Sequence, residues 1–174
     1  QALGAEGGGS LYMCRRAPDG TEVPGWGDAD GKVEVAFGYA NADNATFPGA
    51  PAALPSDLAW DVQTDRSVMT DRVVVFGQGS ASDGTRTDRD RYVARLDVTA
   101  TGATTDPTFN SGSAFTYNAT GVLNDNNRRG LVEADGKIVS SGYTDLGGAL
   151  DNHIFLIRLS ADGTLDADFG GFSD

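Results

Sequence analysis

The sequence has little of what most catalytic and metal sites are made from. Its 174 residues include one cysteine, Cys14, and one histidine, His153. A structural zinc site needs about four such ligands and a disulfide needs two cysteines, so both are excluded within this chain. No G-x-S-x-G motif occurs, and His153 stands directly before an apolar run that begins at Ile154. We therefore expect His153 to lie in a loop or at a strand edge, and we expect no catalytic residues.

Basic residues and long apolar runs are scarce as well. The chain has 13 Lys and Arg against 25 Asp and Glu, a net charge of -12, which repels phosphate backbones and anionic membrane surfaces. No stretch approaches the roughly 18 consecutive apolar residues of a membrane span. Neither nucleic acid nor membrane insertion is expected. The chain begins at Gln1 without the features of a signal peptide, which favours a processed chain or a fragment, and we expect an extracellular, cell-surface or periplasmic location.

Glycine, by contrast, is abundant and indicates many turns. The chain has 24 glycines, about twice the average share of roughly 7%. The glycine-rich start, residues 1–10, is expected to be a flexible leader. Residues 11–174 are expected to form a single domain or part of a larger one, since domains usually have roughly 100 to 200 residues.

One pattern recurs along the chain: an apolar strand, a turn containing glycine, a short second strand and an aromatic residue. Its last copy runs from Ile154 to Gly170 and reads IFLIRLSADGTLDADFG. The same order occurs in Tyr92–Asn110 and in Leu11–Gly27. Each copy has an arginine and an aromatic residue at corresponding positions, which are Arg15, Arg95 and Arg158, and Trp26, Phe109 and Phe169. An internal repeat of this kind predicts stacked structural units.

A hairpin precedes two of the three copies. Leu131–Tyr143 and Asp61–Gly79 each contain two β-rich runs separated by turn residues, which is typical of a hairpin. A further alternating segment, Lys32–Gly38, predicts a half-buried strand, and residues 114–118 are its expected counterpart in the next unit.

These motifs resemble the Delta-60 repeat, a bacterial repeat that joins a hairpin with a DGK turn to a strand, a DGSLD-like turn and a Phe-Gly ending. The match is specific for Leu131–Gly170 and looser for Asp61–Asn110, where the turns are longer. The resemblance implies four-stranded, blade-like sheets of the β-propeller type. It implies no reaction and no agreed ligand.

We therefore expect an all-β fold of antiparallel sheets in propeller-like blades. The runs Ile154–Ile157 and Val73–Phe76 are apolar on both strand faces, which suits a sheet covered on both sides. The expected units are a partial one at 11–57 and further ones at 58–128 and 129–174. That is about two and a half to three blades, whereas a closed propeller typically has 4 to 8.

Too few blades to close a ring leave open strand edges and apolar sheet faces, which predicts an association site. Three arrangements stay open: a fragment of a longer propeller, a ring completed by copies of this chain or by another chain, and an open stack. Charging Val74 or Leu156 is expected to prevent assembly.

Several polar and aromatic groups have both a plain and a functional interpretation. Asp28 and Asp30 precede a turn glycine, which is typical of a simple turn and gives only a weak possibility of calcium, because the rest of an EF-hand loop is missing. The oxygen-rich segments 83–90 and 124–127 have the same two interpretations, and Asp88–Arg91 is expected to be a solvated turn. Cys14 is either a small buried side chain or a reactive thiol. The repeated aromatic residues are either core anchors or a stacking surface for sugars.

Loops offer the remaining candidate positions for a ligand. The insertion Tyr39–Leu58 contains Phe47, and Tyr143 stands near Asp145. Long loops on a rigid scaffold often bind ligands. Asn44 and Asn118 begin Asn-X-Thr sequons, which are glycan acceptors only in a source that glycosylates.

The expected function is an extracellular or cell-surface structural and protein-interaction module, a non-catalytic subunit that associates with other subunits or with itself through open blade edges. The alternative is a lectin-like propeller that binds carbohydrate or another ligand, whose binding would depend on Phe47 or Tyr143. A hydrolase or lyase propeller is a further alternative, and it requires acid and base groups that converge from several blades.

Overall fold

The computed structural model shows an all-β protein with antiparallel sheets. It describes residues 2–5, 11–35, 58–80, 89–119, 124–145, 147 and 152–170. These residues form strands and turns with one short 3-10 turn, η2 (Asn110–Gly112), and contain no α-helix. The predicted fold class is therefore confirmed.

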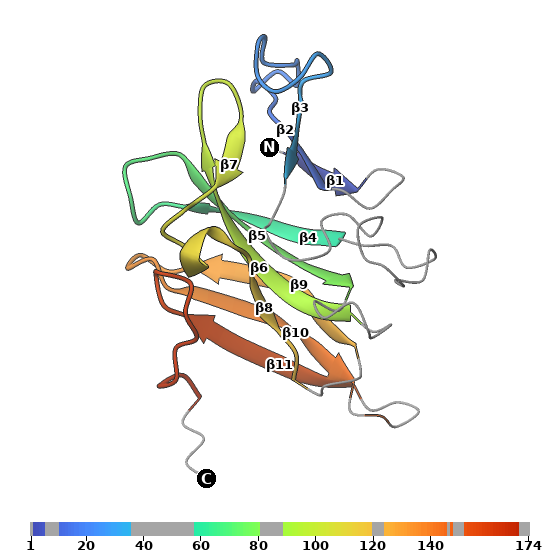
Figure 1. Ribbon diagram of the computed structural model, residues 1–174, viewed down its shortest axis with the longest axis vertical. Coiled ribbons are helices and arrows are strands. Elements are labelled where there is room, and N and C mark those ends of the chain that lie inside the picture. The colour runs from blue at the N-terminus through green and yellow to red at the C-terminus, as the bar shows by residue number, and fades with distance from the viewer. Residues whose placement is uncertain are drawn as a thin grey trace.

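The strands form three sheets, which Figure 1 shows stacked along the long axis of the molecule. The first sheet has the order β1-β2-β3, with β1 (Ala2–Ala5), β2 (Leu11–Cys14) and β3 (Lys32–Val35). The middle sheet has the order β4-β5-β6-β7, with β8 also paired to β6; its strands are β4 (Leu58–Asp65), β5 (Arg72–Ser80), β6 (Arg89–Val98), β7 (Ala103–Thr105) and β8 (Phe115–Tyr117). The third has the order β11-β10-β9, with β9 (Asp125–Val132), β10 (Ile138–Asp145) and β11 (Asn152–Leu159).

The expectation of an unstructured leader is wrong over part of residues 1–10. Residues 2–5 form β1, which pairs with β2 from Ala2 opposite Cys14 to Ala5 opposite Leu11. Pairing on this side satisfies backbone groups that β2 would otherwise present as an open sheet edge. The third sheet also begins earlier than the expected unit boundary at 129, because β9 starts at Asp125.

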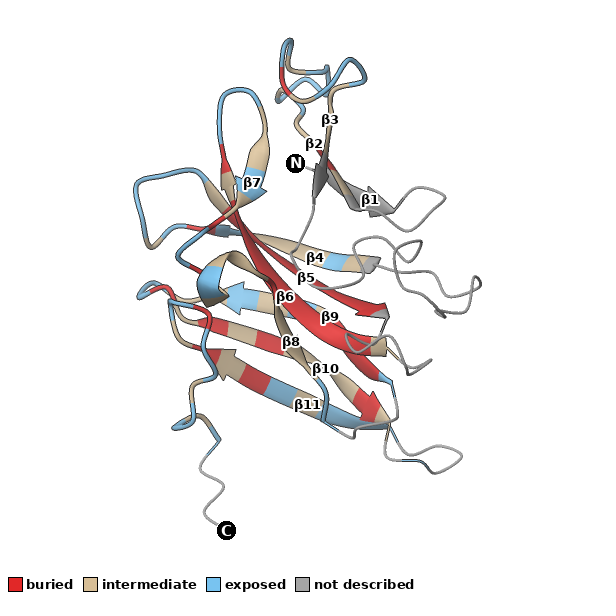
Figure 2. Ribbon diagram, viewed as in Figure 1, coloured by how far each residue is buried: buried red, intermediate tan, exposed pale blue. Residues whose placement is uncertain are grey.

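The middle sheet is covered on both faces, as its apolar run predicts. Val73 and Val75 pack toward the first sheet, and Val74 and Phe76 toward the third. Figure 2 shows this as the buried centre of β5 and β6. The expectation that charging Val74 acts on assembly is wrong, because its side chain is 0% exposed between two sheets of the same chain.

The third sheet is covered on one face only. Ile157 and Leu159 are buried against the middle sheet, whereas Ile154 and Leu156 are 83% and 51% exposed. The prediction that Ile154–Ile157 is covered on both sides is therefore wrong within the described part of the chain. Strands alternate their side chains between two faces, and here one of those faces has no neighbouring sheet among the described residues.

Register confirms that β3 and β8 occupy corresponding places. Val33 pairs with Met13 of β2, and Phe115 pairs with Val93 of β6. Met13 and Val93 are themselves corresponding residues, two positions before the repeated arginines Arg15 and Arg95. The expected strand at Lys32–Gly38 is described to Val35, and residues 36–38 lie outside the described part.

Two β-bulges also recur in register. The ladder between β4 and β5 shifts at Trp60, next to Gly77, and the ladder between β9 and β10 shifts at Arg128, next to Gly142. A bulge increases the local twist and re-aims the extra side chain. Trp60 and Arg128 are thereby brought together, with the guanidinium 4.0 Å from the indole centroid.

Candidate interaction surface

Neighbouring sheets are joined at both junctions by the same backbone hydrogen bond. Gly27 N donates to Thr101 O at 2.9 Å, and Asn110 N donates to Asp162 O at 2.7 Å. In each case the donor directly follows the repeated aromatic residue, and the acceptor directly precedes the turn glycine of the next sheet. We call this contact the interlock. The two junctions between neighbouring sheets therefore share the same backbone contact.

The repeated aromatic residues anchor this interlock. Trp26 and Phe109 are each 1% exposed. The indole N–H of Trp26 donates to Thr99 O at 3.1 Å in the turn of the middle sheet. Phe109 packs so closely on the turn of the third sheet that a Cβ added to Gly163 would lie 2.8 Å from its ring. The prediction of core anchors is confirmed for these two residues.

The repeated arginines reach across the same junctions. The Nε of Arg95 donates to Asp106 at 2.6 Å, and its Nη1 donates to Ala161 O of the third sheet at 2.7 Å. Its guanidinium lies 5.0 Å from the centroid of Phe109. In the first junction, Arg15 Nη1 approaches Thr99 O at 3.4 Å. An arginine of one sheet thus donates to a turn carbonyl of the next.

The third sheet carries the same group of residues at its outer side. Arg158 donates from Nε to Asp166 at 2.9 Å, and its guanidinium lies 4.7 Å from the centroid of Phe169. Phe169 is only partly buried and Gly170 is exposed, unlike Phe109 at the junction. The donor half of the interlock is therefore formed here, and no acceptor turn lies against it among the described residues.

The face beside this group carries exposed apolar side chains. Leu131 of β9 and Ile154 and Leu156 of β11 are 57%, 83% and 51% exposed, and they share one sheet face with Val139 of β10. The exposed Arg129 lies on the same face. We call this the outer face of the third sheet. Figure 2 shows exposed segments along β9 and β11. Apolar side chains that cluster on an open face usually mark an interaction site.

Register relates this outer face to a buried face of the middle sheet. Counted from the repeated arginines and glycines, Leu156 corresponds to Val93 and Val139 to Val74. Val93 and Val74 are both 0% exposed in the junction with the third sheet. The outer face therefore shares these two apolar positions with a sheet junction.

The opposite end of the stack carries the acceptor half. In the turn of the first sheet, the backbone and hydroxyl of Thr21 donate to Asp19 at 3.0 and 2.7 Å. Thr164 and Asp162 make the same two bonds in the third sheet. These bonds hold the pKa of both carboxyls below the ordinary value. Gly20 occupies the position that corresponds to Gly163. A Cβ added to Gly20 would meet no heavy atom within 4 Å, whereas a Cβ added to Gly163 would lie 2.8 Å from the Phe109 ring.

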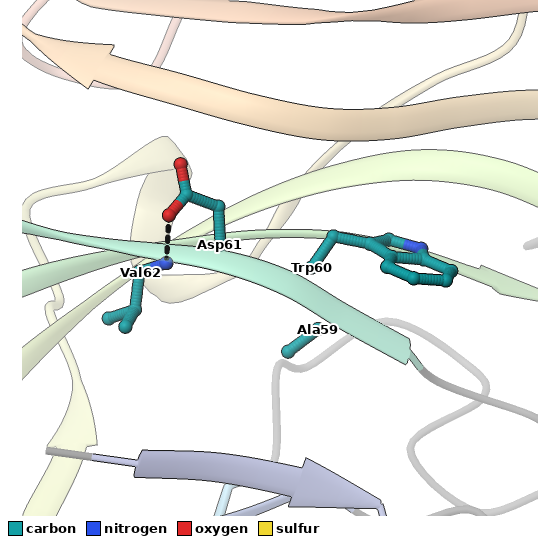
Figure 3. A pocket seen from close by; sticks show the side chains of 4 residues that line it. All are labelled: Ala59, Trp60, Asp61 and Val62. Carbon is teal, nitrogen blue, oxygen red and sulfur yellow. Dashed lines mark hydrogen bonds between the residues drawn. The ribbon is translucent and has the colours of Figure 1, made fainter.

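A small hollow lies on the edge strand β4. It has a volume of about 170 Å³ and is lined by Ala59, Trp60, Asp61 and Val62. Figure 3 shows Asp61 pointing toward the third sheet and Ala59 and Val62 pointing the other way. Asp61 accepts a hydrogen bond from Gly130 N at 3.0 Å, so its carboxylate joins β4 to β9.

Beside this hollow, Arg128 bridges two aromatic side chains. Its guanidinium stacks on Trp60, which is 44% exposed, and donates to the hydroxyl of Tyr143 at 2.9 Å. Of these three residues, the sequence indicates only Tyr143. The others are brought in by the bulges, and a strand interrupted next to a repeated glycine is the sequence signal that could have found them.

The acidic candidates serve structural roles. Asp28 Oδ1 accepts from the backbone N–H of Asp30 and of Lys32, each at 2.9 Å, and so closes the turn ahead of β3. Among the described residues, no three His, Cys, Asp or Glu side chains gather as a metal site. The expectation of a solvated turn is wrong for Asp90 and Arg91, which are 2% and 0% exposed in β6.

The other candidate residues are dispersed. His153 is exposed and lies within β11 opposite Thr144, and Asn118 is exposed just after β8. Cys14 is half-buried in β2. Phe47, Asn44, most of the Tyr39–Leu58 insertion and residues 83–88 lie outside the described residues.

Comparisons with family models, with curated proteins and with solved structures give no match. The resemblance to the Delta-60 repeat stays a prediction. Within the described residues, no helix has the length and apolar character needed to cross a bilayer.

Proposed function

We propose that the chain is a structural and protein-interaction module, a non-catalytic subunit of a larger assembly outside the cell. The observation that supports this most strongly is the outer face of the third sheet. Leu156 is 51% exposed there, whereas Val93, its counterpart in the middle sheet, is fully buried by the next sheet. Exposed apolar side chains such as these are stabilised when another protein covers them, since each Å² of apolar surface removed from water contributes about 25 cal/mol.

Light scattering after size-exclusion chromatography, at several protein concentrations, tests this proposal. Wild type is expected to associate, and Leu156→Glu is expected to stay a monomer, because association would bury an unpaired charge. Met69→Glu is the matched control, since Met69 is fully exposed and belongs to the turn between β4 and β5 of the middle sheet rather than to the outer face. A wild-type chain that remains a monomer at every concentration would contradict the proposal.

A glycan ligand is the second candidate, because the Arg128 guanidinium lies near the rings of both Trp60 and Tyr143, and Trp60 is 44% exposed. Aromatic faces of this kind can stack on sugar rings. Glycan-array binding that is lost in Trp60→Ala and kept in Leu156→Glu would favour this function over association.

A further inference from the structure

The two halves of the interlock lie at opposite ends of the stack. The donor half is the group Arg158, Asp166, Phe169 and Gly170 on the third sheet. The acceptor half is the turn 17–21 of the first sheet, in which Ala17 N donates to Thr21 O at 2.9 Å, as Ser160 N does to Thr164 O at 2.8 Å. The second of these turns is already docked in the chain, where Asn110 N donates to Asp162 O.

The sheet faces beside the two halves correspond in the same way. Tyr12 of β2 corresponds to Tyr92, which is 0% exposed against the first sheet, and to Phe155, which packs against the middle sheet. Tyr12 itself is half-buried on the side of β2 that faces away from the middle sheet, since its neighbour Met13 points into the core. At Tyr12 the first sheet thus presents the position by which the later sheets dock on the sheet before them, with Lys32 Nζ 5.9 Å from the ring centroid.

We propose that a second copy of this chain docks head to tail on the outer face of the third sheet. The turn 17–21 of one copy meets Phe169 and Gly170 of the other, and the face around Tyr12 covers Leu156. This inference rests on the proposed function and names its partner. The contact repeats the junctions within the chain, so it requires no new kind of interface.

Two copies supply the number of sheets that a ring needs. The described residues of each chain form three sheets, so a pair has six, within the roughly 4 to 8 blades of closed propellers. A head-to-tail contact joins two different surfaces of the chain. It gives a closed ring only if the rotation from one copy to the next returns to the first copy; otherwise further copies keep adding. A closed pair covers both outer faces at once, and the expected assembly is therefore a dimer.

Two variants that each block one end test the direction of pairing. Leu156→Glu blocks the outer face of the third sheet, and Tyr12→Glu blocks the face of the first sheet. Each variant alone is expected to be a monomer of 18.1 kDa under conditions in which wild type is a dimer. An equimolar mixture is expected to give a 1:1 dimer, because one intact donor end and one intact acceptor end remain. Native mass spectrometry resolves the mixed species.

Ile154→Glu is a second block of the outer face that leaves the core untouched, because Ile154 is 83% exposed, and circular dichroism of each variant confirms that it folds. A dimer that persists in Tyr12→Glu but is lost in Leu156→Glu would overturn head-to-tail pairing and leave the proposed function standing, since it would show two outer faces meeting each other. A wild-type monomer would contradict both. An open series of larger oligomers would overturn the closed pair.

Discussion

Two arginines of β6 show how differently the same side chain contributes at the residue scale. Arg95 is 5% exposed and is paired with Asp106, Thr108 and Ala161 O. Arg91 is 0% exposed, and its Nε and Nη2 have no hydrogen-bond partner among the described residues. Burial lowers the pKa of Arg91, with Asp125 opposing the shift. Its ring contact with Phe155, at 4.9 Å, is its clearest support.

This contrast predicts opposite responses to the same substitution. Arg95→Met is expected to lower the free energy of unfolding by about 3 kcal/mol, because it removes the closest cation of the buried Asp106 carboxylate and leaves only Arg72 Nε, at 3.4 Å. Arg91→Met is expected to be neutral or stabilising, because it removes a charge that is poorly satisfied. Urea denaturation of both variants measures the difference. Equal losses of unfolding free energy in the two variants would contradict the predicted difference between the paired Arg95 and the poorly paired Arg91.

Asp106 makes stability depend on pH. Burial raises the pKa of Asp106, but hydrogen bonds from Thr108 and Arg95 outweigh it and hold the pKa below the ordinary 3.8. A carboxyl whose folded pKa is depressed stabilises the fold above its unfolded pKa, and this stability is lost as the pH falls through the folded value. We expect the free energy of unfolding to fall as the pH drops below about 4.

The control for this effect is Asp106→Asn. This variant is expected to be less stable than wild type at neutral pH and to show a flatter decline in acid. Denaturation curves between neutral pH and strong acid give the comparison, and an identical acid slope in both proteins would refute the role of Asp106.

At the scale of elements, the close contact between β9 and β5 depends on Gly130. A Cβ added to Gly130 of β9 would overlap the ring of Phe76 from β5. Gly130→Ala is therefore expected to cost about 1–3 kcal/mol through overpacking. Gly102→Ala is the matched control, because its added Cβ would lie 3.4 Å from Val33, close to ordinary contact. Thermal unfolding separates the two, and similar losses would contradict the account.

Strand content and order could be predicted from local sequence, whereas charge burial could not. The hairpin at Leu131–Tyr143 has a clear turn between two β-rich runs, and its strands form as expected. The segment Asp88–Arg91 has alternating charges, which indicates a solvated turn. Part of it is instead buried in β6, because groups from other sheets surround it, such as Phe155 over Arg91. Contacts of this kind join residues far apart in the chain and leave no local pattern.

The sequence predicts that an exposed apolar face exists, but it does not predict which sheet carries it. An incomplete set of blades predicts an exposed apolar face, and Leu156 does lie on it. Val74 has the same apolar strand context, yet it is buried, because the middle sheet has neighbours on both sides. Only the order in which the sheets stack distinguishes the two positions. The sequence likewise shows the repeated aromatic residue of the interlock, but not the turn of the next sheet that accepts its hydrogen bond.

At the scale of the whole molecule, three stacked sheets form two junctions within the chain and leave a third junction surface open. The middle sheet is buried on both faces, while the third sheet keeps Ile154 and Leu156 exposed. The same interlock operates at both internal junctions. We expect association to cover the outer face of the third sheet.

Hydroxyl-radical footprinting of the wild-type chain at low and high protein concentration tests this expectation. Oxidation of Ile154 and Leu156 is expected to fall as the concentration rises, while oxidation of Met69, which is fully exposed in the turn between β4 and β5 of the middle sheet, stays constant. Equal oxidation of Ile154 and Leu156 at all concentrations would show that the outer face stays in water, and would contradict the account.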